Sequence, residues 1–107
     1  MTKLLLDECV PQGLRSHLSE FETFTVTYMG WGGLKNGELL QTAVSHQFDV
    51  FLTTDKNLQY QQNMHKHAIT IVVFDVVRLE LDNILVLLPK FKKIIYSIEK
   101  HRIYVID

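Results

Sequence analysis

The sequence contains few of the residues that cross-link or interrupt a chain: of 107 residues, one is cysteine, two are proline and five are glycine. A single cysteine, Cys9, excludes an internal disulfide and is compatible with a reducing compartment. The longest strictly apolar run, Ile84–Leu88, is far shorter than the roughly 20 residues of a membrane-spanning helix. The first three residues lead directly into an apolar run, so we expect no signal peptide. These absences predict a small, soluble, cytoplasmic protein with no membrane partner.

The chain also lacks a large charge of either sign, because its formal net charge is −1. The charges are nevertheless unevenly distributed. Residues 1–82 hold six Lys and Arg against ten Asp and Glu, whereas residues 83–107 hold five against two. The basic segment is explained either by the solvated lysine face of a helix or by a flank that holds phosphates, with Lys90 and Lys93 as the contacting groups.

Apolar patterns of strand and helix type alternate along the sequence. We expect strands at Lys3–Leu6, Thr23–Thr27, Asp49–Thr54, Ile69–Phe74 and Ile103–Ile106, and helices at Pro11–Glu20, Asn36–His46, Asn57–Met64 and Asp82–Lys100. Asn36 and Asp82 are the expected helix caps, Pro89 is expected to bend or restart the last helix, and Tyr28–Lys35 and His65–His67 are expected to be a loop and an exposed turn. This alternation predicts one three-layer α/β domain over residues 1–107, with a five-stranded, mainly parallel sheet between helices.

Acidic residues follow two of the expected strands. Asp7 comes directly after the first strand, Asp55 after the third, and Glu38 lies in the first turn of the second expected helix. Since the strands of a parallel sheet all end at one edge, we expect these three carboxylates to gather there. Carboxylates repel one another unless they share a hard cation such as Mg²⁺ or Mn²⁺. The residues therefore predict a metal site that leaves positions open for water and phosphate, suited to metal-dependent phosphodiester chemistry.

Each acid also has a purely structural explanation. Asp7 could cap the helix that follows it, and Glu38 could simply complement the positive end of its helix. Asp55, followed by Asn57, could form a turn in which the aspartate side chain accepts a main-chain hydrogen bond. Asp75, after the fourth strand, is best explained as a cap.

Three segments, taken in order, resemble the PIN-like domains, small metal-dependent nucleases that are frequent as toxins of bacterial toxin–antitoxin pairs. A compact prokaryotic subgroup opens with a strand ending in Asp-Glu-Asn, with a proline soon after. Here Leu4–Pro11 reads Leu-Leu-Leu-Asp-Glu-Cys-Val-Pro. The subgroup then has an acid at the head of a helix, matched by Glu38, and a Thr-x-Asp-x-Asp-Phe-like turn, matched by Thr53–Leu58. The resemblance covers nearly the whole chain in order and spacing.

The resemblance implies a Mg²⁺- or Mn²⁺-dependent endoribonuclease, a hydrolase that cleaves RNA. Asp7, Glu38 and Asp55 would hold the metal, and Asn57 would position the attacking water. It also implies a small antitoxin that covers the site, and self-association as a homodimer. Two positions depart from the pattern: Cys9 stands where the subgroup has asparagine, and Asn57 where it often has a second aspartate.

Two other functions remain open from the sequence. Because Asn57 contributes no charge, the chain could be a catalytically inactive PIN-like module that binds nucleic acid or protein. A receiver-type phosphoacceptor domain would also have acids after its first strand and an aspartate after its third. Receivers carry Ser or Thr after the fourth strand, however, and this chain has Asp75 there. Trp31, between glycines in the expected loop, could stack on a base or pack on the core of its own domain.

Overall fold

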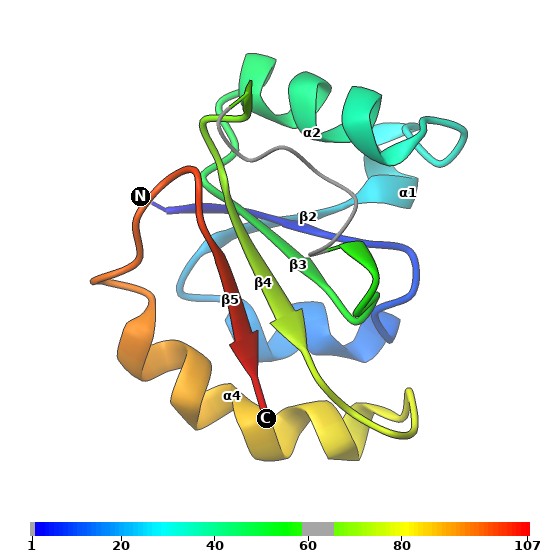
Figure 1. Cartoon of the computed structure of the whole chain (residues 1–107). Helices are drawn as coiled ribbons and strands as arrows, with labels where there is room; N and C mark the ends of the chain where they lie inside the picture. Colours follow the sequence, from blue (N-terminus) through cyan, green and yellow to red (C-terminus); the bar gives the residue numbers. More distant parts are fainter. Residues whose placement is uncertain (1, 59–65) are drawn as a thin grey trace.

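The protein forms an α/β domain with a five-stranded sheet in strand order β2-β1-β3-β4-β5. The computed structural model describes residues 2–58 and 66–107 (Figure 1). The strands are β1 (Lys3–Leu6), β2 (Glu22–Thr25), β3 (Val50–Thr53), β4 (Thr70–Phe74) and β5 (Ile103–Ile106). The described helices are the 3₁₀ helix η1 (Gln12–Leu18), α1 (Val26–Met29), α2 (Asn36–Ser45) and α4 (Leu81–Ile94). Every strand pair is parallel, which confirms the predicted fold class.

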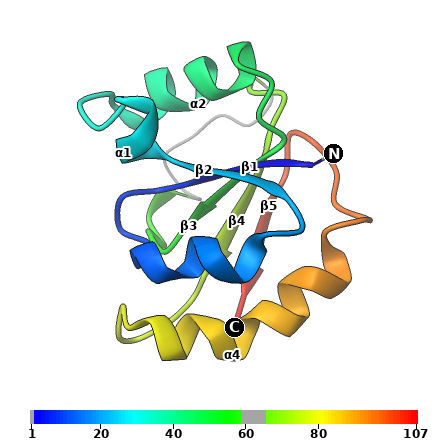
Figure 2. The same ribbon diagram turned by 180° about the vertical axis from the view of Figure 1, so that it is seen from behind.

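Helices cover both faces of the sheet (Figures 1 and 2). Side chains alternate along a strand, so β1 sends Leu4 and Leu6 to one face and Leu5 to the other. Leu4 and Leu6 join the core under η1 and α4, while Leu5 joins the core under α1 and α2. All three are fully buried. The continuous apolar strands of the sequence therefore result from burial on both faces of the sheet.

The predicted bounds of the second strand and of the first helix are wrong, and the strand ends early for an identifiable local reason. Val26 and Thr27 do not extend the second strand, because the Thr25 side chain accepts a hydrogen bond from the Tyr28 N–H at 3.0 Å and starts a one-turn helix there. Gly30, with φ of 76°, ends that turn in the left-handed conformation that glycine adopts without strain. The first predicted helix is shorter than expected and is a 3₁₀ helix.

The predicted caps are also wrong. Lys35 rather than Asn36 precedes α2, and Glu80 rather than Asp82 precedes α4, with no side-chain cap bond at either position. Helix α4 runs without interruption through Pro89 and ends at Ile94 instead of Lys100.

Both the hydroxyl and the backbone N–H of Ser97 donate to the Ile94 carbonyl, at 3.1 and 2.8 Å, which satisfies that end of α4. The predicted helix Asn57–Met64 and the turn at His65 fall mostly on residues 59–65, outside the described residues. None of the helices in the described part of the chain is long and apolar enough to cross a membrane.

Candidate metal and nucleotide site

The candidate site lies where β1 and β3 end side by side. From β1 the chain crosses to β2 on one side, and β3 occupies the other side, so this is the point at which the strand order reverses. In open α/β sheets, ligands bind beyond the strand ends at such a point. Asp7 directly follows β1, and its backbone N–H donates to the Leu52 carbonyl of β3 at 2.9 Å. The topology therefore fixes Asp7 at the position where this fold places ligands.

A buried hydroxyl connects Asp7 to Asp55. The Thr53 hydroxyl donates to Asp7 Oδ2 at 2.8 Å and accepts from the backbone N–H of Asp55 at 3.0 Å. Thr53 is 0% exposed, so its hydrogen bonds form away from competing water. Cys9 Sγ lies 3.5 Å from Asp7 Oδ2 and 3.4 Å from Thr53 Oγ1. The prediction that Asp7 and Asp55 share one edge of the sheet is therefore met in detail, through Thr53.

Asp55 is shaped by a tight turn. Its Oδ1 accepts the backbone N–H of Asn57 at 3.0 Å, and its carbonyl accepts the N–H of Leu58 at 3.2 Å. This is the aspartate turn considered from the sequence, and it orients the Asp55 carboxylate through the Asn57 N–H. The Asn57 side chain is exposed, so its amide is open to solvent.

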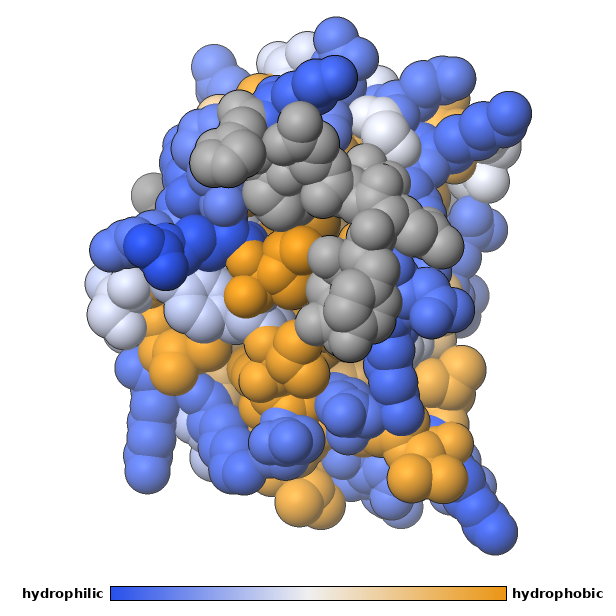
Figure 3. Space-filling model, in the orientation of Figure 1, coloured by the Kyte–Doolittle hydropathy of each residue, from blue (hydrophilic) through white to orange (hydrophobic). Residues whose placement is uncertain are grey.

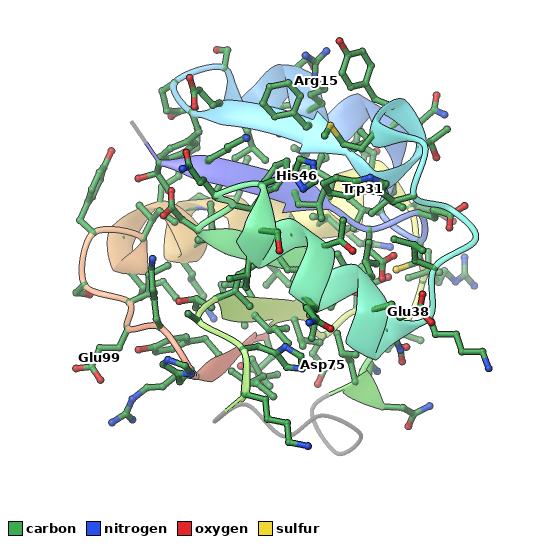
Figure 4. All side chains as sticks on the ribbon, turned by 90° about the horizontal axis from the view of Figure 1, so that it is seen from above. Arg15, Trp31, Glu38, His46, Asp75 and Glu99 are labelled. Carbon is green, nitrogen blue, oxygen red and sulfur yellow. The ribbon has the colours of Figure 1, made fainter. Side chains whose placement is uncertain are left out.

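Glu38 is not joined to this network. It lies in the first turn of α2, as predicted, with an exposed side chain that forms no hydrogen bond or ion pair with another described residue. Figure 4 places it at the beginning of α2. Across residues 2–58 and 66–107, no three His, Cys, Asp or Glu side chains lie close enough together to hold a metal ion. The structure thus links the Asp7 carboxylate to the backbone of Asp55 through Thr53, and leaves Glu38 outside this network.

The donor set still fits a hard divalent cation. Mg²⁺ is usually bound by one or two carboxylates and completes its octahedron with waters and substrate phosphates. Asp7 Oδ1 accepts one hydrogen bond, from the Glu8 N–H at 2.8 Å, and a carboxylate oxygen has room for two such partners. Asp7 and Asp55, which follow the adjacent strands β1 and β3, therefore supply ligands of the kind and number that such a site uses.

A fourth acid at this edge is already paired. Asp75 directly follows β4, and its Oδ1 lies 2.7 Å from Lys56 Nζ. Because Lys56 follows Asp55 in sequence, the pair ties the end of β4 to the loop after β3. Both side chains are partly exposed, so the ion pair contributes little to stability. From the sequence Asp75 was expected to be a cap; in the structure its carboxylate forms this ion pair with Lys56.

A pocket of about 380 Å³ adjoins Asp7. It is formed by the β1–η1 connection, by η1 and by the junction of β2 with α1, and its lining residues are Asp7, Glu8, Val10, Gln12, Arg15, Thr25, Thr27 and Tyr28. The sequence analysis did not single out Arg15 or Tyr28. Only their positions in the sequence could have pointed to them: Arg15 lies on η1, between β1 and β2, and Tyr28 lies on α1, directly after β2.

The other proposed nucleic-acid contacts lie elsewhere. The Trp31 ring packs 4.9 Å from the His46 ring and 5.8 Å from the Phe48 ring (Figure 4). Of its two interpretations, packing on the protein's own core is the one observed. Lys90 and Lys93 line a separate groove between α4 and β5, and Lys90 Nζ donates to the Asp107 carbonyl. Figure 3 shows hydrophobic surface over β5 beside hydrophilic side chains.

No protein-family model, curated protein or solved structure matches this chain significantly. The likeness to PIN-like domains therefore rests on the three short motifs, and the function has to be inferred from the geometry of the site.

Proposed function

We propose that the protein is a Mg²⁺- or Mn²⁺-dependent ribonuclease that hydrolyses RNA at the edge of the sheet where β1 and β3 end. The observation that carries this proposal is the link from Asp7 through the buried Thr53 hydroxyl to Asp55, at the reversal of the strand order. In this proposal Asp7 and Asp55 hold the metal. Glu38 would add a third carboxylate from the start of α2 once its exposed side chain rotates toward them.

The residues of the chain have separate tasks in this chemistry. When bound, the metal supplies Lewis acidity toward the phosphate and favours ionisation of a bound water. Thr53 fixes the orientation of the Asp7 carboxylate, and the aspartate turn fixes Asp55. The exposed Asn57 amide positions the attacking water. The water oxygen bonds to phosphorus, one ribose–phosphate ester bond breaks, and the water proton passes to solvent as the leaving alkoxide takes up a proton.

The resemblance to PIN-like toxins supports a wider setting for the same activity. It implies a cytoplasmic toxin of a toxin–antitoxin pair, held inactive by a small antitoxin that covers the carboxylates, and self-association into a homodimer. Size exclusion with light scattering tests the dimer, and coexpression with a neighbouring small open reading frame tests the antitoxin.

Two alternatives have specific support. Glu38 stands apart from the two aspartates and Asn57 adds no charge, which favours a catalytically silent PIN-like module that binds nucleic acid or protein. The strand order 2-1-3-4-5 also occurs in receiver domains, so Asp55 would be the phosphoacceptor. Asp75 after β4, where receivers have Ser or Thr, argues against a receiver. Incubation with a small phosphodonor, read by intact mass, separates that function from the others.

The primary test combines metal binding with cleavage. Wild type should melt at a higher temperature in Mn²⁺, because a ligand at about 100 times its Kd stabilises the fold by about 2.7 kcal/mol. Asp7→Asn and Asp55→Asn should lose both this shift and cleavage of a labelled RNA, with unchanged circular dichroism. Asp75→Asn, at the same edge, is the matched control and should retain both. Cleavage by purified Asp7→Asn at the wild-type rate would overturn the proposal.

A further inference from the structure

The pocket beside Asp7 combines chemical groups that recognise a nucleotide. Figure 2 shows the elements that frame it: η1 and α1 lie on opposite faces of the sheet, next to the edge strand β2. The pocket volume of about 380 Å³ lies within the range of small-ligand sites. Asp7 lines it, so whatever occupies it lies directly against the carboxylate of the proposed reaction.

Arg15 provides an oriented phosphate ligand on one side of this pocket. Its Nε donates to the Thr23 carbonyl at 2.9 Å, and the Thr23 hydroxyl in turn donates to the Leu18 carbonyl at 3.1 Å. These bonds fix the plane of the guanidinium group. Within the described part of the chain, no other hydrogen bond or ion pair engages it. Four of its five N–H donors therefore remain available, in the fork geometry that matches phosphate oxygens.

Tyr28 provides an exposed aromatic face on the other side. It is 76% exposed, although it belongs to a helical turn that is fixed by the Thr25 cap and by Gly30. Its ring also leans on Phe24, with ring centres 5.9 Å apart. A large aromatic ring held in water by a fixed backbone is suited to stacking on a nucleobase, an interaction that every base can make.

The charges of the pocket make binding depend on a cation. Asp7 and Glu8 carry two negative charges against the single positive charge of Arg15. A β-carbon on Gly32 would lie 3.3 Å from Glu8 Oε2, so the exposed Glu8 carboxylate lies close to that glycine. A divalent cation at Asp7 changes the balance from −1 to +1, which is the sign that attracts phosphate.

We propose that this pocket binds one nucleotide of single-stranded RNA next to the cleavage site, with its phosphate on Arg15 and its base stacked on Tyr28. The metal dependence of this binding rests on the proposed function, whereas the contacts of Arg15 and Tyr28 do not. This assignment replaces Trp31, Lys90 and Lys93 as the expected nucleic-acid contacts.

The test is the affinity for a fluorescein-labelled single-stranded RNA of about eight nucleotides, measured by anisotropy in Mn²⁺, with its length checked on a gel afterwards. Tyr28→Ala and Arg15→Gln should each weaken binding about tenfold or more, since removing one base stack costs roughly 5- to 150-fold. Tyr28→Phe keeps the ring and should bind as wild type. The matched control is Tyr96→Ala, which removes an equally exposed tyrosine (80%) after α4 and should leave binding within about twofold.

The outcomes separate this proposal from the proposed function. If Mn²⁺ raises the melting temperature but Tyr28→Ala and Arg15→Gln bind RNA as wild type does, the nucleotide pocket is wrong and the metal site stands. If Mn²⁺ does not change the melting temperature while both variants bind RNA more weakly than wild type, the pocket is supported and the metal-dependent nuclease is not. Equal weakening by Tyr96→Ala, equal affinity for duplex RNA, or no binding by wild type would each overturn the pocket.

Discussion

The two ends of the parallel sheet use polar side chains in different ways. At the end where the strands begin, the side-chain hydrogen bonds of the described residues run to the main chain. The Asp49 carboxylate accepts the Lys3 backbone N–H at 2.8 Å, and the Lys3 ammonium donates to the His46 carbonyl at 2.7 Å. The hydroxyl of Thr70 donates to the Glu99 carbonyl, also at 2.7 Å. These bonds join each strand to the connection that precedes the neighbouring strand.

At the end where the strands finish, side chains bond to one another as well as to the main chain. Thr53 donates to the Asp7 carboxylate, and Cys9 lies against both. Asp7 remains partly exposed and lines a pocket. The polar groups at the first end stabilise the fold, whereas the Asp7 carboxylate is also available to a ligand. The buried Thr53 hydroxyl fixes the orientation of this carboxylate while part of it stays accessible in the pocket. Polarity alone, which is similar at both ends, does not make this distinction.

Substitution of two buried threonines, one at each end of the sheet, tests the difference between the ends directly. Thr53 is 0% and Thr70 1% exposed, so Thr53→Val and Thr70→Val each remove one buried hydroxyl at nearly constant volume. Each should lower the free energy of unfolding by about 0.5–1.5 kcal/mol, because a hydrogen bond to a partly exposed partner is lost. Urea denaturation measures this loss. Only Thr53→Val should also reduce the Mn²⁺-dependent shift in melting temperature, since only Thr53 orients Asp7. Equal reduction in both variants would show that the two ends are not distinct.

Lys3 tests the structural end with a smaller effect. Its ammonium lies 4.3 Å from the centre of the Phe48 ring and 5.5 Å from that of Phe24, besides bonding to the His46 carbonyl after α2. Lys3→Met should lower the free energy of unfolding by about 0.5–1 kcal/mol, the typical size of an exposed cation–π contact. Lys35→Met, at an exposed lysine without an ion pair among the described residues, should change it little. Neither variant should alter the Mn²⁺ shift; a change in Lys3→Met would mean that the two ends are coupled.

Much of the fold follows from sequence because burial on both faces leaves continuous apolar strands. Leu4–Leu6 and Thr70–Phe74 could be recognised in this way, and alternation with helical segments predicted the parallel sheet. Where the predicted end of the second strand is wrong, a local hydrogen bond is the cause. Val26 has the β-branched side chain of a strand residue, but the cap formed by Thr25 starts a helix at that point.

The site was predictable only to the level of the sheet edge. Topology places Asp7 and Asp55 at one edge, so their shared location follows from the strand pattern. The role of Thr53 could not be predicted, because the apolar pattern of a strand shows which residues are buried but not which group a buried hydroxyl contacts. Glu38 illustrates the other limit: its place depends on the path of the loop before α2, which no periodic pattern encodes.

The smallest predicted effect lies on the surface, away from both ends of the sheet. The hydrogen bond from Lys92 lowers the pKa of Glu20 below its ordinary value, and a main-chain hydrogen bond within Glu20 adds to the shift. The two charged groups lie 3.0 Å apart. A carboxyl whose pKa is lowered by folding stabilises the folded state at pH values above its unfolded pKa, and this contribution disappears as pH falls through the folded pKa.

Lys92→Gln should therefore melt slightly below wild type at neutral pH, and the two curves should converge as the pH falls below the ordinary glutamate range. Lys93→Gln, which removes a neighbouring exposed lysine, should follow wild type throughout. Because both partners are solvent-exposed, added salt should also shrink the difference at neutral pH. A difference that persisted in acid would mean that Lys92 acts by packing its methylene groups on η1 and α4 rather than by its charge. In that case Lys92 would belong with the side chains that stabilise the fold, such as Lys3, rather than with a charge pair that responds to pH.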